Sequence, residues 1–587
     1  MRTTAILFVL VCSLLSPMVS ATVQPSSENE INPTDEGNVI ATFSPIIQAA
    51  LAHKSDLSMY STSQLNSVQQ WVVIASHFDG QPAEELPGAW IVDVEQSTGP
   101  ELFSQLQESG QIEAFYPLVE NDMLPRWVPN DPKFSDQWHL QNTGQSSGTS
   151  GEDVNITGAW NTYRGAGIVI GIVDDGLDWN HPDLDNYYES TLDYDFCGND
   201  GDPTPASNDP HGTASAGVAA GVGDNNIGVS GSAPRAGLAG LQLISCSTTD
   251  TRESSALSHE RQNIDIYSNS WGPSDNGETL EAPGPLMLAA MENDALIGRN
   301  GLGNIITWAA GNGLTDDDNS NYDGYANLRY TIAVTAVSHN GDQSYYAEPG
   351  ANILVASPSN GDNEGITTTD IEGSAGYTNS DYTDNFGGTS SATPLVSGII
   401  ALMLEANSNL TWRDVQHILV LTSRQNDASD SSWNVNGANH DVSHKYGYGV
   451  IDAGAAVFMA ESWTPVADET SVTTGTLNCI QCDIPDNSAN YVSVNTTVSE
   501  PVLVENVDVV VDIPHAFRGD LEIILTSPAG TQSILSEKHG DGGNNFNDWR
   551  FSTVHHWDED SRGEWTLTVE DQGNGDTGSL DSWELIV

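Results

Sequence analysis

Hydrophobic and polar positions divide the first part of the chain into two segments of different texture. Residues 22 to about 65 are polar and mixed, whereas Trp71–Ile74 and Trp90–Val94 have the pattern of strands. Glu101–Ser109 has the spacing of a short amphipathic helix. We therefore expect a small α+β unit that ends at Leu124–Arg126.

From residue 127 to about 460 the chain alternates apolar strands with helices. Ile168–Val173 and Ile305–Ala310 predict buried strands, and a helix opens at His211. The apolar run Leu395–Leu404 predicts a buried helix, because it is shorter than the ~20 residues that a membrane span needs. This alternation is typical of an α/β domain.

After Trp463–Pro465 the pattern changes to short strands separated by turns. The predicted strands are Val502–Val511, Leu521–Leu525, Trp565–Val569 and Trp583–Val587. Strands of this length and spacing predict an antiparallel β-sandwich of about 120 residues.

The amino terminus has the features of a secretion signal. Arg2 precedes an apolar run from Ala5 to Leu15, and Val19–Ala21 supplies the small residues that a signal peptidase accepts. We expect residues 1–21 to be removed. A membrane anchor is the less favoured alternative, because the apolar run is shorter than the ~20 residues of a span.

The cysteines fit an exported protein. Removal of the signal also removes Cys12 and leaves Cys197, Cys246, Cys479 and Cys482, for which disulfides are the first expectation. Four cysteines allow three pairings, and proximity in the sequence favours Cys479 with Cys482 and Cys197 with Cys246. A redox pair or half of a zinc site is an alternative for the Cys-x-x-Cys segment, but no second pair with ligand spacing follows it.

The composition is that of a folded, strongly acidic protein. Its 587 residues are 38% hydrophobic and 17% charged, and 81 acidic residues against 17 basic ones give a formal charge of −64. Such a surface repels nucleic acid and favours basic partners and cations. The charge also suits solubility in a salty or calcium-rich exterior.

Three separate blocks carry the residue types of a serine protease. They are Ile172–Gly176, His211–Thr213 and Gly388–Pro394. A serine becomes nucleophilic when a histidine takes its proton, and a carboxylate orients that histidine. We assign these roles to Ser390, His211 and Asp174, and their order along the chain is that of the subtilisin arrangement.

Acyl transfer also needs hydrogen-bond donors for the oxyanion of the tetrahedral intermediate. Asn312, in Ala309–Gly313 after a predicted strand, is the candidate side-chain donor, together with the Ser390 N–H. An ordinary turn asparagine before glycine is the alternative.

Longer segments resemble the kexin and furin type of subtilase, the proprotein convertases. These segments are Tyr267–Pro273, Leu404–Asn407, Leu410–His417 and Tyr446–Gly454. The strand-rich tail resembles the P domain of convertases at Arg518–Leu521 and His556–Asp560, so the resemblance covers about residues 127–587. An integrin-binding role of Arg518–Asp520 is disfavoured, because P domains carry the same tripeptide structurally.

The resemblance implies a domain order and a fold class. It implies a propeptide at 22–126, a subtilisin-like peptidase domain at 127–462 and a P domain at 463–587. The peptidase domain is expected to have a parallel sheet with helices on both faces, the P domain a jelly-roll or β-sandwich, and the propeptide a small α+β fold. Autocleavage is predicted after Arg126, although Pro125 departs from the paired-basic pattern.

Convertases cleave after basic residues because carboxylates line the substrate cleft. By resemblance, Asp275 and Asp323 face the basic side chain before the scissile bond, Asp175 the preceding side chain, and Glu253 and Glu281 the residue four positions back. The segment Ser270, Trp271 and Gly272 is expected to contact the substrate backbone. Asn208 stands where a convertase acid is expected, with Asp209 beside it, so selectivity for a second basic residue rests on fewer acids.

The resemblance also implies two to three calcium sites, because calcium takes carboxylate, amide and carbonyl oxygens. The first set is Asp131, Asp183 and Asn225 with the carbonyls of Gly223, Ile227 and Val229. The second set is Asp275, Asp318 and Glu348, and the third is Asp195, Asp200 and Asp202.

The sequence therefore predicts a secreted, calcium-dependent serine endopeptidase that cleaves proteins or peptides after Arg or Lys, preferably at dibasic sites. Its own propeptide is an expected partner, and participation of an external chaperone stays open. No nucleic acid and no membrane anchor are expected. A broad-specificity degradative subtilisin is the first alternative, and an inactive calcium-binding adhesin or scaffold is the second.

Overall fold

The computed structural model describes residues 39–43, 45–55, 57, 60, 62–83, 86–119, 127–487 and 490–587. The chain divides into two compact units, Met1–Pro125 and Arg126–Val587. The predicted signal at 1–21 and the predicted cleavage site at Arg126 lie outside the described residues.

The first unit is an antiparallel sheet with helices on both faces. Its sheet has the order β2-β3-β1-β4, with β1 (Gln70–Ile74), β2 (Gln81–Pro82), β3 (Ala89–Asp93) and β4 (Ala114–Pro117). Side chains alternate across β1: Trp71 and Val73 pack with Phe103 of α3 (Gly99–Glu108), and Val72 and Ile74 pack with Leu51 of α1 (Pro45–Ser55). A further helix, α2, spans Thr62–Ser67. The predicted α+β texture is confirmed.

The larger unit begins with a seven-stranded sheet of order β11-β10-β9-β8-β5-β7-β6, in which every neighbouring pair is parallel. The strands are β5 (Val169–Asp174), β6 (Tyr194–Asp195), β7 (Gly237–Gln242), β8 (Ile266–Asn269), β9 (Ile305–Ala309), β10 (Thr331–Val337) and β11 (Ile353–Pro358). The predicted α/β domain is confirmed. Most of these strands are buried throughout, as expected for a parallel sheet covered on both faces.

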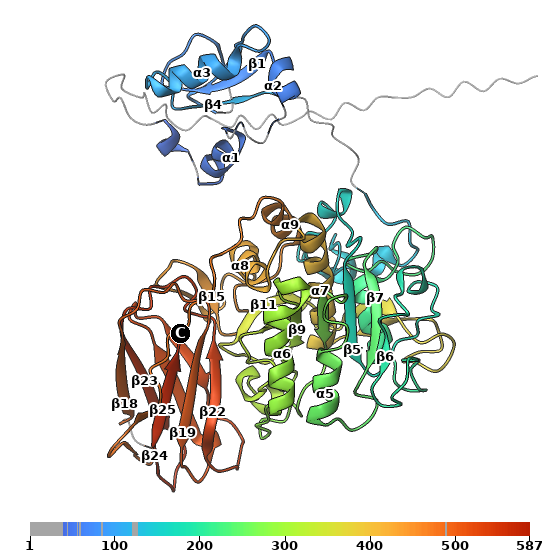
Figure 1. Ribbon diagram of the computed structural model, residues 1–587, viewed down its shortest axis with the longest axis vertical. Coiled ribbons are helices and arrows are strands. Elements are labelled where there is room, and N and C mark those ends of the chain that lie inside the picture. Colours follow the sequence, from blue (N-terminus) through green and yellow to red (C-terminus); the bar gives the residue numbers. More distant parts are fainter. Residues whose placement is uncertain are drawn as a thin grey trace, which may run out of the picture. The chain divides into compact units, whose positions relative to one another are not determined.

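Helices cover both faces of this sheet (Figure 1). One apolar core joins strand side chains such as Ile170 to α4 (His211–Ala220), α7 (Thr389–Ala406), α8 (Trp412–Thr422) and α9 (Ala453–Glu461). The other joins Val173 and Trp308 to α5 (Asp250–Leu257) and α6 (Pro285–Ile297). Two small antiparallel pairs, β12 (Ile366–Thr369) with β13 (Tyr382–Phe386) and β14 (Trp433–Val435) with β15 (Asp441–Ser443), complete the domain.

The apolar helix is longer than the sequence pattern predicts. It begins at Thr389 rather than at Leu395, so that Ser390 lies in its first turn. Among the described residues α7 alone has the length and apolarity of a membrane span, and most of it is buried inside the protein. It is therefore the central core helix of this domain.

The last part of the chain is a sandwich of two four-stranded antiparallel sheets with one shared core. The first sheet contains β16 (Leu477–Asn478), β25 (Ser582–Ile586), β19 (Val507–Ile513) and β22 (Phe546–Thr553). The second contains β18 (Val492–Val498), β23 (Gly563–Asp571), β20 (Leu521–Thr526) and β21 (Gln532–Ser536), and β17 (Asp483–Ile484) pairs with β24 (Gly578–Ser579). The predicted sandwich is confirmed, although its strand β19 starts at Val507 rather than at Val502.

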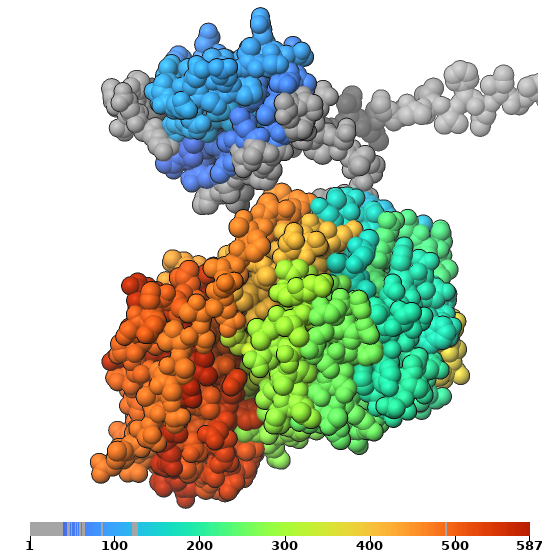
Figure 2. Space-filling model, viewed as in Figure 1, coloured from blue at the N-terminus to red at the C-terminus, as the bar shows by residue number. Residues whose placement is uncertain are grey.

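The sandwich packs directly against the α/β domain (Figure 2). Arg413 of α8 donates two hydrogen bonds to Glu505, and His417 lies 2.8 Å from the same carboxylate. Burial alone would raise the pKa of Glu505, but His417 and Arg413 more than offset it and lower the pKa to about 2. A partly buried, charged junction therefore joins the two domains.

Both favoured cysteine pairings are present. Cys197 is bonded to Cys246, and Cys479 to Cys482.

Candidate active site

Asp174 and His211 meet because a strand end and a helix start face each other. Asp174 is the last residue of β5, and His211 is the first residue of α4. The Nδ1 atom of His211 lies 2.8 and 2.9 Å from the two carboxylate oxygens of Asp174. A Cβ atom on Gly212 would lie 2.1 Å from the Gly176 carbonyl oxygen, so glycine there allows the helix to approach the strand this closely.

The pair has the electrostatics of an oriented base. Asp174 is 1% exposed, whereas the His211 side chain is 25% exposed and can be reached from the surface. Burial lowers the pKa of His211, but the Asp174 carboxylate more than offsets it, so that the net pKa is raised. The carboxylate thus favours the protonated imidazole, which is the form that arises when the ring takes a proton.

Ser390 and Ser391 have different surroundings. Ser391 is fully buried, and its Oγ lies 2.6 Å from the hydroxyl of Ser359. Ser390 is partly exposed, lines the same cavity as His211, and its Oγ lies 3.4 Å from the Ser270 carbonyl oxygen. Only Ser390 of this pair is therefore placed to reach a ligand in the cavity.

Asn312 lies beside the start of α7. Its side-chain oxygen accepts hydrogen bonds from the backbone N–H of Thr389 at 2.8 Å and from the Thr389 hydroxyl at 3.1 Å. These bonds fix the amide group and turn its nitrogen away from the helix. Gly388 has a φ of 76°, and a Cβ there would lie 3.1 Å from the Asn312 oxygen, so this close packing favours glycine.

The cavity that contains His211 and Ser390 has a volume of about 280 Å³. It is lined by Asn312 and by five of the predicted substrate-contacting residues, Ser270, Trp271, Gly272, Asp275 and Asp323. The sequence thus identifies residues from several distant segments that the fold brings to one opening.

Asp323 and Asp275 bring two carboxyl groups to this cavity. Burial raises the pKa of Asp323 to about 8, although the backbone N–H of Tyr325 donates to it at 2.7 Å. A Cβ on Gly272 would lie 2.8 Å from the Asp323 carboxylate, so the glycine leaves room in front of it. A buried carboxylate of this kind favours a cationic partner.

Asp175 does not line this cavity. Its two carboxylate oxygens accept the backbone N–H groups of His211 at 3.1 Å and Gly212 at 2.7 Å, and thus bind the amino end of α4. Burial first, and then the neighbouring Asp174 charge, raise the pKa of Asp175 to about 7. A basic substrate side chain would share a carboxylate that already holds the helix.

Glu253 and Glu281 do not line the cavity either, but they surround Tyr325. The Tyr325 hydroxyl donates to Glu253 at 3.0 Å, and Thr248 donates to the other oxygen at 2.6 Å. Glu253 is 6% exposed, so it is not a solvated surface charge. Glu281 is exposed, and its backbone pairs with that of Asp323 in an isolated parallel β-bridge.

The second predicted calcium set fits a cation. Glu348 is 2% exposed, and burial together with the charges of Asp318 and Asp275 raises its pKa well above the usual range. Among the described residues, no lysine or arginine forms an ion pair with these three carboxylates. A divalent ion bound by these oxygens would neutralise this charge.

The first predicted set is also gathered in one place. Asp131 accepts the backbone N–H groups of Asp224 and Asn225, and Asp183 accepts that of Val229. Burial raises the pKa of both carboxylates. The Asn225 side chain here donates its N–H to Asp183 at 2.7 Å, and its oxygen faces the N–H of Ile227. A calcium ion held by this set would bind the oxygen of this amide, which here accepts the Ile227 N–H.

The third set lies in the loop after β6. The backbones of Asp195 and Asp200 pair in an isolated antiparallel β-bridge. The Asp195 carboxylate accepts the backbone N–H groups of Cys197 and Gly198. Asp202 is held by the Thr204 hydroxyl. The loop is fastened by its own turns and by the disulfide, so this set gives weaker support for a cation than the second.

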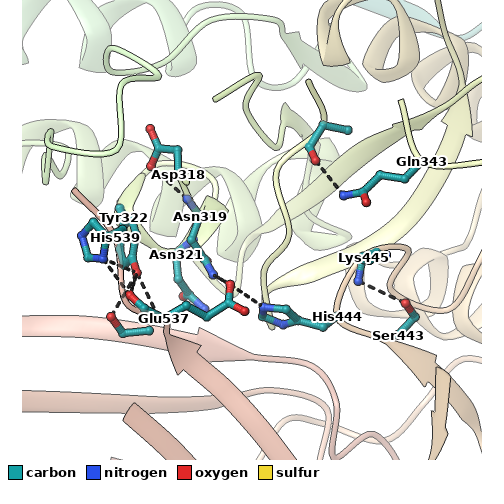
Figure 3. A network of polar contacts seen from close by, with 12 residues as sticks. Asp318, Asn319, Asn321, Tyr322, Gln343, Ser443, His444, Lys445, Glu537 and His539 are labelled. Carbon is teal, nitrogen blue, oxygen red and sulfur yellow. Dashed lines mark hydrogen bonds and ion pairs between the residues drawn. The ribbon is translucent and has the colours of Figure 1, made fainter. Parts of the chain in front are cut away.

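The β-sandwich contacts the segment that carries Asp318 and Asp323 (Figure 3). The Asn319 amide donates to Glu537 at 3.2 Å, and His444 lies 3.2 Å from the same carboxylate oxygen. Tyr322 stacks on His539 with ring centres 4.3 Å apart. The sandwich therefore buttresses a loop on which both a predicted calcium ligand and a predicted pocket residue lie.

Sequence reasoning missed several residues that position the site. Thr389 holds Asn312, Asn360 accepts the Gly388 N–H at 2.8 Å, and Tyr325 holds Glu253. Thr389 could have been noticed, because it adjoins Ser390 in the Gly388–Pro394 block. Asn360 and Tyr325 carry no local signal, since their partners are distant in the sequence.

Comparison with known proteins supports this arrangement. A family model described as "Subtilase family" matches residues 165–449, and one described as "Proprotein convertase P-domain" matches residues 504–587. "Neuroendocrine convertase 2" of Homo sapiens is 40% identical over 479 residues, which cover 78% of this chain and 74% of that protein.

More distant matches agree. "PC3-like endoprotease variant B" of Hydra vulgaris is 39% identical over 465 residues, which cover 76% of this chain and 64% of that protein. The match to "PC3-like endoprotease variant A" of the same organism covers 58% of that protein's length. The solved serine protease of Aeromonas sobria, in complex with the chaperone ORF2, has a TM-score of 0.72 at 26% identity and covers 80% of this chain and 96% of its own. The chain belongs to the subtilase family of serine endopeptidases, and it has the proprotein convertase type of architecture, with a P domain after the peptidase domain.

Proposed function

We propose that this chain is a secreted, calcium-dependent serine endopeptidase that cleaves polypeptides on the carboxyl side of Arg or Lys. The observation that carries the specificity is the position of Asp275 and Asp323 in the cavity of Ser390 and His211. Two carboxylates beside a nucleophile stabilise a guanidinium or ammonium group of the substrate by charge-assisted hydrogen bonds.

In the proposed mechanism the Ser390 hydroxyl attacks the scissile carbonyl carbon, and His211 accepts its proton. Asp174 holds the imidazole at Nδ1 and stabilises its charged form, after which His211 gives the proton to the leaving amine. The Asn312 amide and the Ser390 N–H donate to the oxyanion. Water then releases the acyl group by the same steps in reverse.

Calcium has a structural role in this proposal. Asp275, Asp318 and Glu348 would hold one ion, Asp131, Asp183 and Asn225 a second, and Asp195, Asp200 and Asp202 a third. A bound ion would supply positive charge to carboxylates that otherwise repel one another. Because Asp275 belongs both to the second set and to the cavity, calcium would also fix one wall of the substrate pocket.

We further propose that residues 22–126 act as a propeptide and that the chain cleaves itself after Arg126. The α+β unit within this segment supports the idea, because it forms its own core apart from the peptidase domain. Sequencing of the amino terminus of the secreted protein tests it. A mature protein that starts elsewhere than at Trp127 would refute this cleavage site.

The decisive test of the function is a comparison of Ser390→Ala with Ser391→Ala. The first variant should lose at least ~10³-fold in kcat, whereas the second keeps the nucleophile and should retain measurable turnover. If Ser390→Ala keeps appreciable peptidase activity, the assignment of the nucleophile is wrong.

Substrate preference is tested with peptides ending in Arg-Arg, Ala-Arg and Phe before the scissile bond. A preference for Arg over Phe of ~10²-fold or more in kcat/KM supports the proposal. The Ala-Arg peptide tests the dibasic preference, which is expected to be modest because Asp175 already binds the start of α4. Equal turnover of all three would favour the broad-specificity subtilisin.

A further inference from the structure

A second group of ionisable side chains lies inside the P domain. His515 follows β19, Asp571 ends β23, and Asp576 lies in the loop between β23 and β24. One ligand atom from each of the three side chains lies within 4.8 Å of the other two. The side chains of His515 and Asp571 are 0% exposed, and that of Asp576 is 12% exposed.

Four polar atoms of this group are buried without a hydrogen bond to any residue that the structure describes. They are Nε2 of His515, Oδ2 of Asp571 and both carboxylate oxygens of Asp576. Buried polar atoms normally find a partner, because an unpaired one costs about 1 to 3 kcal/mol. Unpaired atoms on three converging side chains favour a shared ligand.

The contacts of the imidazole show which of its nitrogens is available. Nδ1 of His515 lies 2.8 Å from the Phe517 carbonyl oxygen and 3.2 Å from the Phe517 backbone nitrogen. The shorter contact makes Nδ1–H a donor to the carbonyl, which leaves a lone pair on Nε2. Histidines that bind metals typically donate their other N–H to a backbone carbonyl or carboxylate in this way.

The distance between the His515 imidazole and the Asp571 carboxylate also fits a shared ion. Nε2 lies 3.4 Å from Oδ2 of Asp571, which is longer than a good N–H···O hydrogen bond of about 2.9 Å. Two ligand atoms on one tetrahedral ion with bonds of 2.0 to 2.1 Å are separated by about 3.3 Å. The lone pair of Nε2 and the carboxylate oxygen therefore face each other at the separation of neighbouring metal ligands.

We propose that His515, Asp571 and Asp576 bind a divalent transition-metal ion, such as zinc, with water as the fourth ligand. An imidazole together with carboxylates suits zinc and its neighbours, whereas calcium takes oxygen ligands alone. The partial exposure of Asp576 provides the route of entry. The ion would link the loop after β23 to the end of β19. Metal binding at these residues does not depend on the proposed peptidase activity.

The test is zinc binding by the full chain in buffer that contains excess calcium, so that the oxygen-only sites are filled. The wild-type chain should bind one zinc more per molecule than His515→Gln, as measured by elemental analysis after dialysis. Glu564→Gln removes an exposed carboxylate from the same strand, β23, and should bind as the wild type does. Equal zinc content in the wild type and in His515→Gln would overturn the proposal.

Asp576→Asn provides a second variant in case His515→Gln does not fold, because Asp576 lies at the rim. Its dissociation constant for zinc should rise at least tenfold, as measured with a competing chelator. Cobalt bound to the wild type should give the intense visible absorption of a tetrahedral site, and this absorption should be lost in Asp576→Asn. An unchanged zinc affinity, or a cobalt spectrum identical in both proteins, would overturn the proposed three-residue site.

Discussion

The side chain of Asn312 donates a hydrogen bond to Asp275, with 3.1 Å between Nδ2 and Oδ2, and the Asn312 backbone N–H donates to the same oxygen at 2.9 Å. The proposed oxyanion donor is thus fastened to a carboxylate of the substrate pocket. Substrate binding and stabilisation of the intermediate share one carboxylate.

Asp275→Asn should therefore lower kcat as well as raise KM for a substrate with Arg before the scissile bond. We expect about a tenfold loss in kcat, which is less than the loss from removal of an oxyanion donor itself. Asp323→Asn is the matched control, because its carboxylate bonds to the backbone of Tyr325 rather than to Asn312. A change confined to KM in Asp275→Asn would contradict the coupling.

Asn312→Ala should lower kcat by about 10² to 10³ with little change in KM, because the side chain bonds to the substrate only when the oxyanion has formed. Steady-state kinetics on one Arg-ending peptide measure this. The variant also frees the Thr389 N–H and hydroxyl, so its thermal unfolding should be recorded in parallel. A rise in KM at constant kcat would assign Asn312 to substrate binding instead.

The pH profile should report the base. The pKa of His211 is raised above its usual 6.5, and only the neutral imidazole accepts the serine proton. Activity should therefore be low in acid and rise with pH through a midpoint above 6.5. Asp174→Asn should lower kcat by about 10⁴. It should also move this midpoint to lower pH, because the carboxylate that raises the pKa of His211 is removed. Glu372→Gln, an exposed carboxylate outside the cavity, should leave the profile unchanged.

Glu348→Gln should change stability in opposite directions with and without calcium. With a chelator present, the variant should melt at a higher temperature than the wild type, because a buried charge repelled by Asp318 and Asp275 is removed. With calcium present, the variant should melt at a lower temperature, because a ligand is lost. A change of the same sign in both buffers would contradict a cation at this site.

Glu505→Gln should weaken the junction between the domains. The pKa of Glu505 is lowered from its usual 4.5 to about 2 in the folded protein. Its ionised form therefore contributes stability that is complete above pH 4.5 and is lost as the pH falls towards 2. The expected loss is about 2 to 3 kcal/mol at pH 7. Chemical unfolding at pH 7 and pH 3 measures it, and Asp560→Asn, which removes an exposed ion pair with Arg562, should have little effect.

The sequence predicted the fold class well because periodicity is a local property. The strand at β5 was predicted within one residue of each observed end, and α4 begins at His211 as predicted. The apolar run Leu395–Leu404 indicated only part of α7, because four of the five residues Thr389–Thr393 carry hydroxyl groups although nearly all are buried. The Ser391 hydroxyl bonds to that of Ser359 and the Thr393 hydroxyl donates to the Thr389 carbonyl, which hydropathy does not reveal.

The candidate site was predicted only in part, because spacing identifies residues but not their partners. Asp175 was expected to face the substrate, yet its carboxylate binds the amino end of α4. Glu253 was expected to face the substrate residue four positions back, and its carboxylate is buried and accepts a hydrogen bond from Tyr325. The roles of these residues stay predictions, since neighbours that come from distant segments decide them.

The position of Ser390 in the first turn of α7 has a consequence for how this protein can change. The remaining turns of that helix are buried in the middle of the peptidase domain, from Ser391 to Leu404. A substitution that shifts the helix along its axis, even at Leu402 far from the cavity, would also displace the serine. Substitutions in this helix that raise thermal stability should therefore often change kcat as well. Substitutions in the strands of the P domain can change thermal stability alone.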